Sequence, residues 1–111
     1  MYEYHATILK VVDGDTIDAH MDLGLEIGIR TRLRLAELDA PERNTEAGKM
    51  AHLWLSDRLP VGLGVVVRTE KDRREKFGRY LAHVTVPGQT VTVNTMMLEM
   101  AMAKPYNGGK R

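Results

Sequence analysis

Three short segments of the chain carry residue types that could act together on a phosphate ester. Residues 13–16 (DGDT) place two carboxylates around a glycine, although Asp-Gly is also a common turn sequence. Residues 34–42 (RLAELDAPE) combine an arginine with three further carboxylates, of which Asp39 and Glu42 flank Pro41. Residues 68–79 hold six basic and three acidic residues, which fits a phosphate-facing loop and equally a solvated charged loop.

The carboxylates of the first two segments form one candidate cluster for a metal ion. Asp15, Asp39 and Glu42 would supply hard oxygen ligands, and Pro41 stiffens the turn that separates the last two. Such oxygens favour Ca²⁺, Mg²⁺ or Mn²⁺ over zinc. The four histidines of the chain show no metal-ligand spacing.

The arginines of the second and third segments could bind an anion beside that cation. Gly78 precedes Arg79 and gives the backbone freedom to aim the guanidinium, whereas Arg34 on a polar strand face could also be a solvated charge. Residues 1–55 carry 6 basic and 10 acidic groups, and residues 56–111 carry 10 basic and 5 acidic groups. This asymmetry is consistent with a cation site beside a phosphate site, or with chance.

Consecutive strands, rather than strands alternating with helices, must position these segments. Alternation, β-branched residues and helical spacing predict strands over 7–12, 16–21, 27–38, 65–69, 80–86 and 90–93, and helices over 46–59 and 95–103. The alternation changes parity after Leu35, which predicts a bulge or a passage from exposed to buried surface. The pattern indicates a mainly β, α+β chain that forms a small, partly closed antiparallel barrel with two short helices.

Capping signals define the ends of the two predicted helices. Asn44 or Thr45 can cap the first helix, and Pro60 ends it. Asn94 is predicted to cap the second, with Val93 and Leu98 at the positions of a hydrophobic staple.

Length and composition exclude several classes of protein. With 111 residues, 43% of them hydrophobic and 28% charged, the chain has the make-up of one globular domain over residues 1–111. No apolar run approaches the roughly 20 residues of a membrane span. The absence of cysteine excludes disulfide scaffolds, thiolate catalysis and cysteine-type zinc sites. The first residues show no secretory signal.

Taken together, in their order and spacing, the three segments resemble the staphylococcal nuclease (thermonuclease) family over about residues 7–104. The shared features are DGDT at 13–16, an arginine followed five residues later by Asp-x-Pro-Glu at 34–42, the run EKFGRYLA at 75–82, and the helix opening VNTMML at 93–98. The resemblance implies an OB-fold, a five-stranded barrel with two short helices.

The resemblance also implies a cation site in the first two segments. Asp15 and Asp39 would bind Ca²⁺, with Mn²⁺ or Mg²⁺ as possible replacements, and the backbone carbonyl of Ala40 would be a further ligand. Asp13 would orient the site without contacting the metal.

The same resemblance assigns the groups that act on the substrate. Glu42 would hold the attacking water, and Arg34 and Arg79 would clamp the scissile phosphate. Lys76 matches a position that contacts a terminal phosphate. Phe77 stands where the family has tyrosine, so one hydroxyl donor to phosphate is absent.

The resulting hypothesis is a Ca²⁺-dependent endonuclease that attacks DNA or RNA in line with water. By resemblance the 5′-oxygen leaves, which gives 3′-phosphate ends, and single-stranded or melted substrate is preferred. The expected protein is a monomer of phage or prophage type in the bacterial cytoplasm. Two alternatives remain open: a catalytically silent OB-fold module that binds nucleic acid or protein, and an assembly component of a phage particle.

Overall fold

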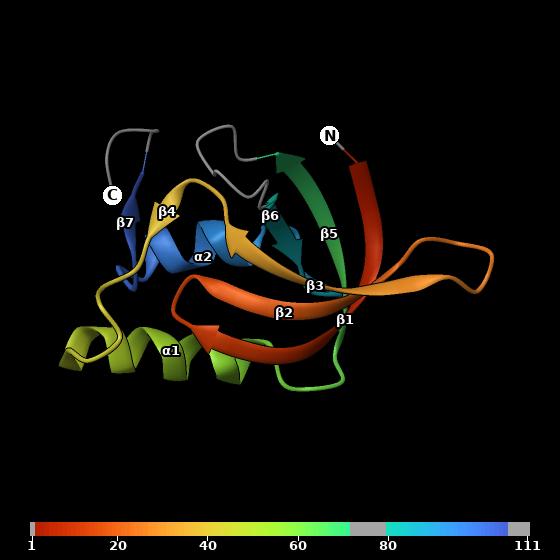
Figure 1. Cartoon of the computed structure of the whole chain (residues 1–111). Helices are drawn as coiled ribbons and strands as arrows, with labels where there is room; N and C mark the ends of the chain where they lie inside the picture. The colour runs from red at the N-terminus through yellow and green to blue at the C-terminus, as the bar shows by residue number, and fades with distance from the viewer. Residues whose placement is uncertain (1, 72–79, 107–111) are drawn as a thin grey trace.

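The described residues of the computed structural model, 2–71 and 80–106, form a closed barrel flanked by two helices (Figure 1). The barrel order is β1-β2-β3-β6-β5, with a separate two-stranded sheet of β4 and β7. In chain order the elements are β1 (Tyr2–Asp13), β2 (Thr16–Asp22), β3 (Gly28–Leu35), β4 (Leu38–Asp39), α1 (Glu46–Arg58), β5 (Gly64–Lys71), β6 (Tyr80–Thr85), α2 (Val93–Glu99) and β7 (Lys104–Pro105). The predicted mainly β barrel with two helices, consistent with an OB-fold, is confirmed.

The barrel is closed by one parallel pair among antiparallel ones. β1 pairs antiparallel with β2 and β5, β2 with β3, and β5 with β6. Closure between β3 and β6 is parallel, and it spans only three pairs, which join Leu33 to Tyr80, Arg34 to Leu81 and Leu35 to Ala82.

Alternate residues of each barrel strand point inward and form the core. This follows from the two-residue period of a strand. The inward residues are all buried: Ala6, Ile8, Ile17, Ala19, Met21, Leu33, Leu35, Val65, Val67, Ala82 and Val84. The opposite face of each strand is therefore free to carry polar groups, and the candidate site lies on such a face.

Helix α1 lies across the end of the β1–β2 hairpin (Figure 1). Thr45 caps it, as predicted, because its Oγ1 accepts a hydrogen bond from the Gly48 backbone nitrogen at 3.0 Å. Ala51 and Leu55 are fully buried. The helix ends at its C-cap Leu59, directly before Pro60.

The long strand predicted over 27–38 is interrupted. β3 ends at Leu35 and the chain turns through Glu37, whose φ of 66° lies in the left-handed region. The turn explains the change of parity, since Leu35, Ala36 and Leu38 are all fully buried. It also redirects the chain so that Asp39 can approach the DGDT turn.

The strand predicted over 90–93 and the cap predicted at Asn94 are both wrong. Thr92 caps α2, with its Oγ1 accepting from the Thr95 backbone nitrogen at 3.1 Å, and the helix ends at Glu99. The Thr92 cap also removes Val93 from the staple position expected for it.

Asn94 instead makes three hydrogen bonds inside the protein. Its Oδ1 accepts from the Val84 backbone nitrogen at 3.1 Å. Its Nδ2 donates to the carbonyl oxygens of Ala36 at 3.1 Å and Ala82 at 2.9 Å. One amide thus ties α2 to β6 and to the turn between β3 and β4.

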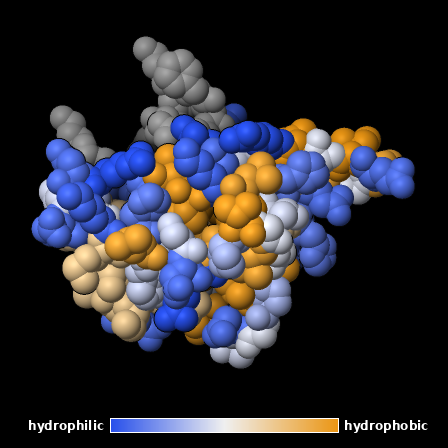
Figure 2. All heavy atoms as spheres, turned by 90° about the horizontal axis from the view of Figure 1, so that it is seen from below, coloured by the Kyte–Doolittle hydropathy of each residue, from blue (hydrophilic) through white to orange (hydrophobic). Residues whose placement is uncertain are grey.

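The β2–β3 hairpin extends beyond the barrel wall. Its tip contains Gly24, Leu25 and Glu26 with φ values of 82°, 54° and 62°. Leu25 and Ile27 are exposed there, and Figure 2 shows hydrophobic side chains among hydrophilic ones on this projection. Among the described residues, no helix has the length and apolar character needed to cross a membrane.

Candidate functional site

The DGDT turn connects β1 to β2 and is fixed by its own side chains. The Asp15 backbone nitrogen donates to Asp13 Oδ1 at 3.1 Å, and Thr16 Oγ1 donates to Asp15 Oδ1 at 3.1 Å. Gly14 is buried, and a Cβ placed there would lie 2.9 Å from the Cβ of Ala40 and 3.0 Å from that of Ala51. The glycine is therefore required by packing between the Ala40 turn and α1, as well as by the turn itself.

Arg34 joins the two carboxylates expected to bind a metal. Its Nη2 donates to Asp15 Oδ2 at 3.1 Å and to Asp39 Oδ1 at 3.5 Å. The register of β2 and β3 sets this meeting, because Thr16 pairs with Arg34 and the Leu35 backbone nitrogen donates to the Asp15 carbonyl at 2.8 Å. The structure thus brings together three of the residues singled out by the sequence.

The guanidinium of Arg34 has a buried donor that these carboxylates do not use. Its side chain is only 20% exposed. Its Nε is buried and has no hydrogen-bond partner in the described part of the chain. A buried N–H without a partner costs free energy, so an anionic group that accepts from it would be stabilising.

Two contacts fix the backbone of Asp39 and Ala40, one to the DGDT turn and one to β7. The Ala40 backbone nitrogen donates to Asp15 Oδ2 at 3.2 Å. Asp39 pairs with Lys104 in the sheet of β4 and β7. The segment after α2 therefore supports the site, a role that no sequence pattern of this two-residue strand indicated.

The neighbouring carboxyl groups of Asp13 and Asp15 have pKa values shifted in opposite directions. Burial raises the pKa of Asp15 to about 6, helped by the hydrogen bond with Asp13 and opposed by the charge of Arg34. Burial also disfavours ionised Asp13, but its hydrogen bonds with the Asp15 side chain and backbone outweigh this and leave its pKa below the ordinary value. The site thus holds more carboxylate than one arginine neutralises.

The donor set fits a hard divalent cation. Carboxylate oxygens of Asp15 and Asp39 both lie against Arg34 Nη2, at 3.1 and 3.5 Å, and hard oxygen donors of this kind suit a divalent cation. No group of three or more His, Asp or Glu side chains that could hold a metal occurs among residues 2–71 and 80–106. Ca²⁺ takes six to eight oxygens, so backbone carbonyls, water and substrate would have to complete its shell.

The chain around Glu42 is fixed while its side chain is exposed. The Glu42 carbonyl accepts from the Thr45 backbone nitrogen at 3.0 Å and from Thr45 Oγ1 at 2.6 Å. A Cβ on Gly48 would collide with the same carbonyl. The first turn of α1 therefore fixes the backbone position from which the Glu42 side chain extends.

The remaining predicted site residues lie outside the described residues. These are Lys76, Phe77 and Arg79. Tyr80, the first described residue after them, pairs with Leu33, the neighbour of Arg34.

The other two arginines of β3 have a separate structural role. Arg32 donates through Nε and Nη2 to Asp18 at 2.8 and 3.1 Å, and Arg30 Nη2 lies 3.4 Å from Asp18 Oδ2. The hydrogen bond from Arg32 lowers the pKa of Asp18, which is 3% exposed. The sequence analysis assigned no role to Arg30, Arg32 or Asp18, although the position of Asp18 opposite Arg32 in a hairpin was a usable signal.

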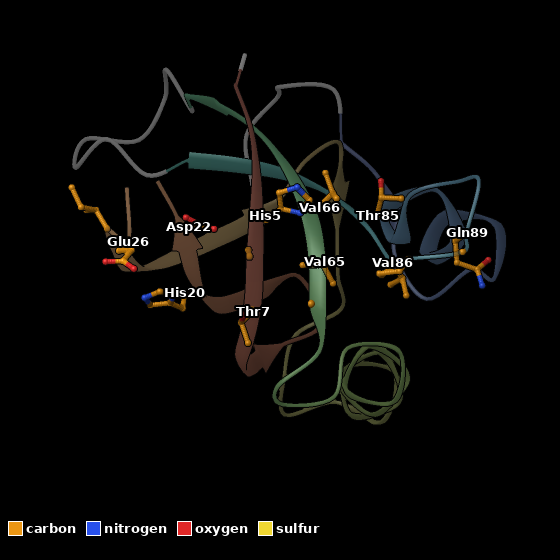
Figure 3. A pocket seen from close by; sticks show the side chains of 16 residues that line it. His5, Thr7, His20, Asp22, Glu26, Val65, Val66, Thr85, Val86 and Gln89 are labelled. Atoms are coloured by element: carbon orange, nitrogen blue, oxygen red, sulfur yellow. The ribbon is translucent and has the colours of Figure 1, made fainter. Parts of the chain in front are cut away.

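A hollow lies on the outer wall of the barrel, away from the candidate site residues. It has a volume of about 820 Å³ and is bordered by His5, His20, Asp22 and Glu26 (Figure 3). The two histidines stand apart in this view, and none of the candidate site residues lines the hollow.

Several known proteins are similar to this chain, and some of them are named as nucleases. The profile of the family described as "Staphylococcal nuclease homologue" matches residues 32–110. An "Uncharacterized endonuclease" of Escherichia coli O157:H7 is 30% identical over 105 residues, covering 94% of this chain and 62% of that protein. A "Micrococcal nuclease" of Shigella flexneri is 33% identical over 111 residues, covering 94% and 59%. "Protein ParB" of Escherichia coli is 32% identical over 116 residues, covering 94% and 58%.

The chain spans about three fifths of the length of these curated relatives. The family profile itself covers most of the chain, from the middle of β3 to beyond β7. The chain belongs to the staphylococcal nuclease homologue family.

Proposed function

We propose that this chain is a divalent-cation-dependent endonuclease that hydrolyses phosphodiester bonds of DNA and RNA, with Ca²⁺ as the preferred ion. The observation that carries the proposal is Arg34, which contacts both Asp15 and Asp39 and retains a buried, unpartnered Nε in the described part of the chain. Cation ligands and an anion donor thus lie within one hydrogen-bonded group. Membership of a nuclease family supports the same activity.

The cation site would be formed by Asp15, Asp39 and the carbonyl of Ala40. A divalent cation bound there neutralises phosphate charge and acts as a Lewis acid. Asp13 holds the Asp15 backbone nitrogen at 3.1 Å and so orients the turn. Hydrogen bonds from Arg34 and from the Ala40 backbone nitrogen fix the rotamer of Asp15.

The chain's own groups would then carry out the hydrolysis. Glu42 accepts a proton from the attacking water. Arg34 and Arg79 donate hydrogen bonds to the phosphate oxygens, where negative charge increases in the transition state. Lys76 and Phe77 would contact the neighbouring part of the substrate. The 5′-oxygen leaves, and the product carries a 3′-phosphate.

Further features of this function are proposed on the same basis. The substrate is single-stranded or melted nucleic acid bound mainly through its phosphates, which makes affinity salt-dependent. The enzyme acts as a monomeric single domain over residues 1–111, is of phage or prophage type, and works in the bacterial cytoplasm.

Cleavage assays with a matched control test the proposal. Purified protein is incubated with labelled single-stranded DNA, duplex DNA and RNA, in Ca²⁺, Mg²⁺, Mn²⁺ or chelator. Glu42→Gln should lose most turnover, whereas Glu3→Gln at an exposed position of β1 should retain it. Product ends that become extendable by a polymerase only after phosphatase treatment would identify 3′-phosphates.

Two results would contradict the proposal. Equal activity of Glu42→Gln and native protein would remove the role given to Glu42. Tight binding of nucleic acid without cleavage in any metal, by a folded protein, would instead indicate the silent binding module.

A further inference from the structure

The open end of the barrel forms a groove lined by three tyrosines. We call it the mouth groove, and it has a volume of about 510 Å³. Tyr2 and Tyr4 reach it from β1, Tyr80 from β6, Ile29 and Thr31 from β3, and Lys71 from β5. The strands β1, β3, β5 and β6 thus each contribute a side chain other than the buried core residues below.

Two of the three tyrosine side chains of this groove are exposed. Tyr2 is 74% exposed and Tyr80 is 44% exposed, while Tyr4 is half-buried. Below them Met21 and Leu33 close the floor and are almost fully buried. Exposed aromatic and apolar surface gathered in one hollow indicates a binding site.

The chemistry of the groove matches a nucleobase. Tyrosine rings offer flat faces for stacking, which every base can use, and stacking on aromatic side chains is a common way to bind single strands. Lys71 supplies a cation at the rim for a phosphate. The rim also contains the carboxylate of Glu70. Its Oε2 lies 3.7 Å from His83 Nε2, a residue outside the groove.

The groove borders the seam between β3 and β6, and β3 also carries Arg34. Tyr80 pairs with Leu33, and Arg34 is the next residue along β3. Because successive side chains of a strand alternate between its two faces, Arg34 lies on the face of β3 opposite to Leu33, which lines the groove. A nucleic acid strand whose phosphate contacts Arg34 would pass over the end of this three-pair seam, beside Tyr80, to place a neighbouring base in the groove.

We infer that the mouth groove is a base-stacking subsite in which Tyr2 and Tyr80, with Tyr4 beneath them, hold an unpaired base of the single-stranded nucleic acid whose phosphate lies at Arg34. The inference rests on the proposed function for its substrate class. It adds a reason for single-strand preference, because a base in a duplex cannot enter the groove without being unpaired.

Binding rather than cleavage provides the test. Fluorescence anisotropy with a labelled oligothymidylate is measured in the Glu42→Gln background, with Ca²⁺ present. Tyr2→Ala and Tyr80→Ala should each weaken binding about tenfold, since one stacked base contributes on the order of 1–3 kcal/mol. Tyr2→Phe and Tyr80→Phe should restore near-native affinity, because stacking needs the ring and not the hydroxyl.

Two further comparisons separate stacking from charge. Leu25→Ala, an exposed change at the hairpin tip outside the groove, should leave affinity unchanged. Lys71→Ala should reduce the slope of log affinity against log salt by about 0.7, whereas the tyrosine variants should not change it. An abasic strand of equal length should bind native protein and the tyrosine-to-alanine variants equally.

The outcomes distinguish this inference from the proposed function. If native protein cleaves and the tyrosine variants bind within twofold of it, the groove subsite is wrong and the nuclease proposal stands. If no protein cleaves but Tyr80→Ala still weakens base-dependent binding, the subsite stands and the nuclease proposal fails. If the tyrosine variants instead abolish self-association seen by sedimentation, the groove binds a second copy and the inference is overturned.

Discussion

Replacing Asn94 with alanine should destabilise the fold more than any substitution on the surface of α2. Two buried backbone groups, the Val84 nitrogen and the Ala36 carbonyl, would lose the partner that the amide supplies. The Ala82 carbonyl would keep one partner, because the Ala36 nitrogen also donates to it at 2.9 Å. Each orphaned buried group costs about 1–3 kcal/mol, so we expect a loss of about 4 kcal/mol.

Urea unfolding followed by circular dichroism measures this loss. A domain of this size has a total stability of about 5–15 kcal/mol, so the variant should remain folded but unfold at a much lower urea concentration. Thr92→Ala, which removes the cap of the same helix, should cost only about 1 kcal/mol. A loss below about 1 kcal/mol for Asn94→Ala would refute the reasoning, because it would mean that water replaces all three hydrogen bonds.

Asn94→Asp provides a second measurement if the alanine variant does not fold. The aspartate can still accept from the Val84 nitrogen, but its ionised oxygen would face the two carbonyls that Nδ2 now contacts. Protonation converts that oxygen into a donor. The stability deficit of Asn94→Asp should therefore shrink as pH falls, and a deficit independent of pH would contradict the assigned bonds.

Three further changes test how the site and the barrel are supported. Gly48→Ala should lower turnover and cost about 1–3 kcal/mol in urea unfolding, because its Cβ meets the Glu42 carbonyl, whereas Gly64→Ala meets nothing within 4 Å and should be near neutral; equal effects would remove the proposed link to Glu42. Asp18→Asn should lower Tm at pH 7, since the pKa of Asp18 is depressed by its arginine partners. This difference should vanish as pH falls from about 4 through the lower folded pKa, and a difference that persists in acid would be inconsistent with an ion pair. Thr45→Ala should cost about 1 kcal/mol through the lost cap, and an unchanged urea midpoint would show that the cap is dispensable.

Local signals were sufficient for most of the barrel and for one helix. Apolar residues recur every second position along β2 and β5, and Ala51 and Leu55 are spaced for one face of a helix. All of these residues lie in the core, so the sequence pattern reflects their burial. The Thr45 cap acts within four residues of its own position, so the sequence alone contains the information. For Asp15, Arg34 and Asp39, the resemblance predicted the set and the β2–β3 register now explains their proximity.

The features that the sequence did not predict depend on distant parts of the chain. An asparagine before a helical pattern can cap that helix or form hydrogen bonds elsewhere. The backbone groups that form hydrogen bonds with Asn94 belong to residues 36, 82 and 84. The left-handed turn at Glu37 is set by the burial of residues on both sides of it. β7 is two residues long and exists because β4 offers it an edge.

The parallel seam between β3 and β6 has a consequence for how activity is gained and lost in time. It joins strands far apart in the chain through three residue pairs, and Arg34 is the middle one. Contacts that close long loops form late in folding, because the chain loses the entropy of loop closure before the stabilising contacts form. A chain that has formed its hairpins but not this seam would be compact yet inactive. On gentle heating, the proposed cleavage activity should therefore decline before the circular dichroism signal does, and the last step of folding would also complete the proposed active site.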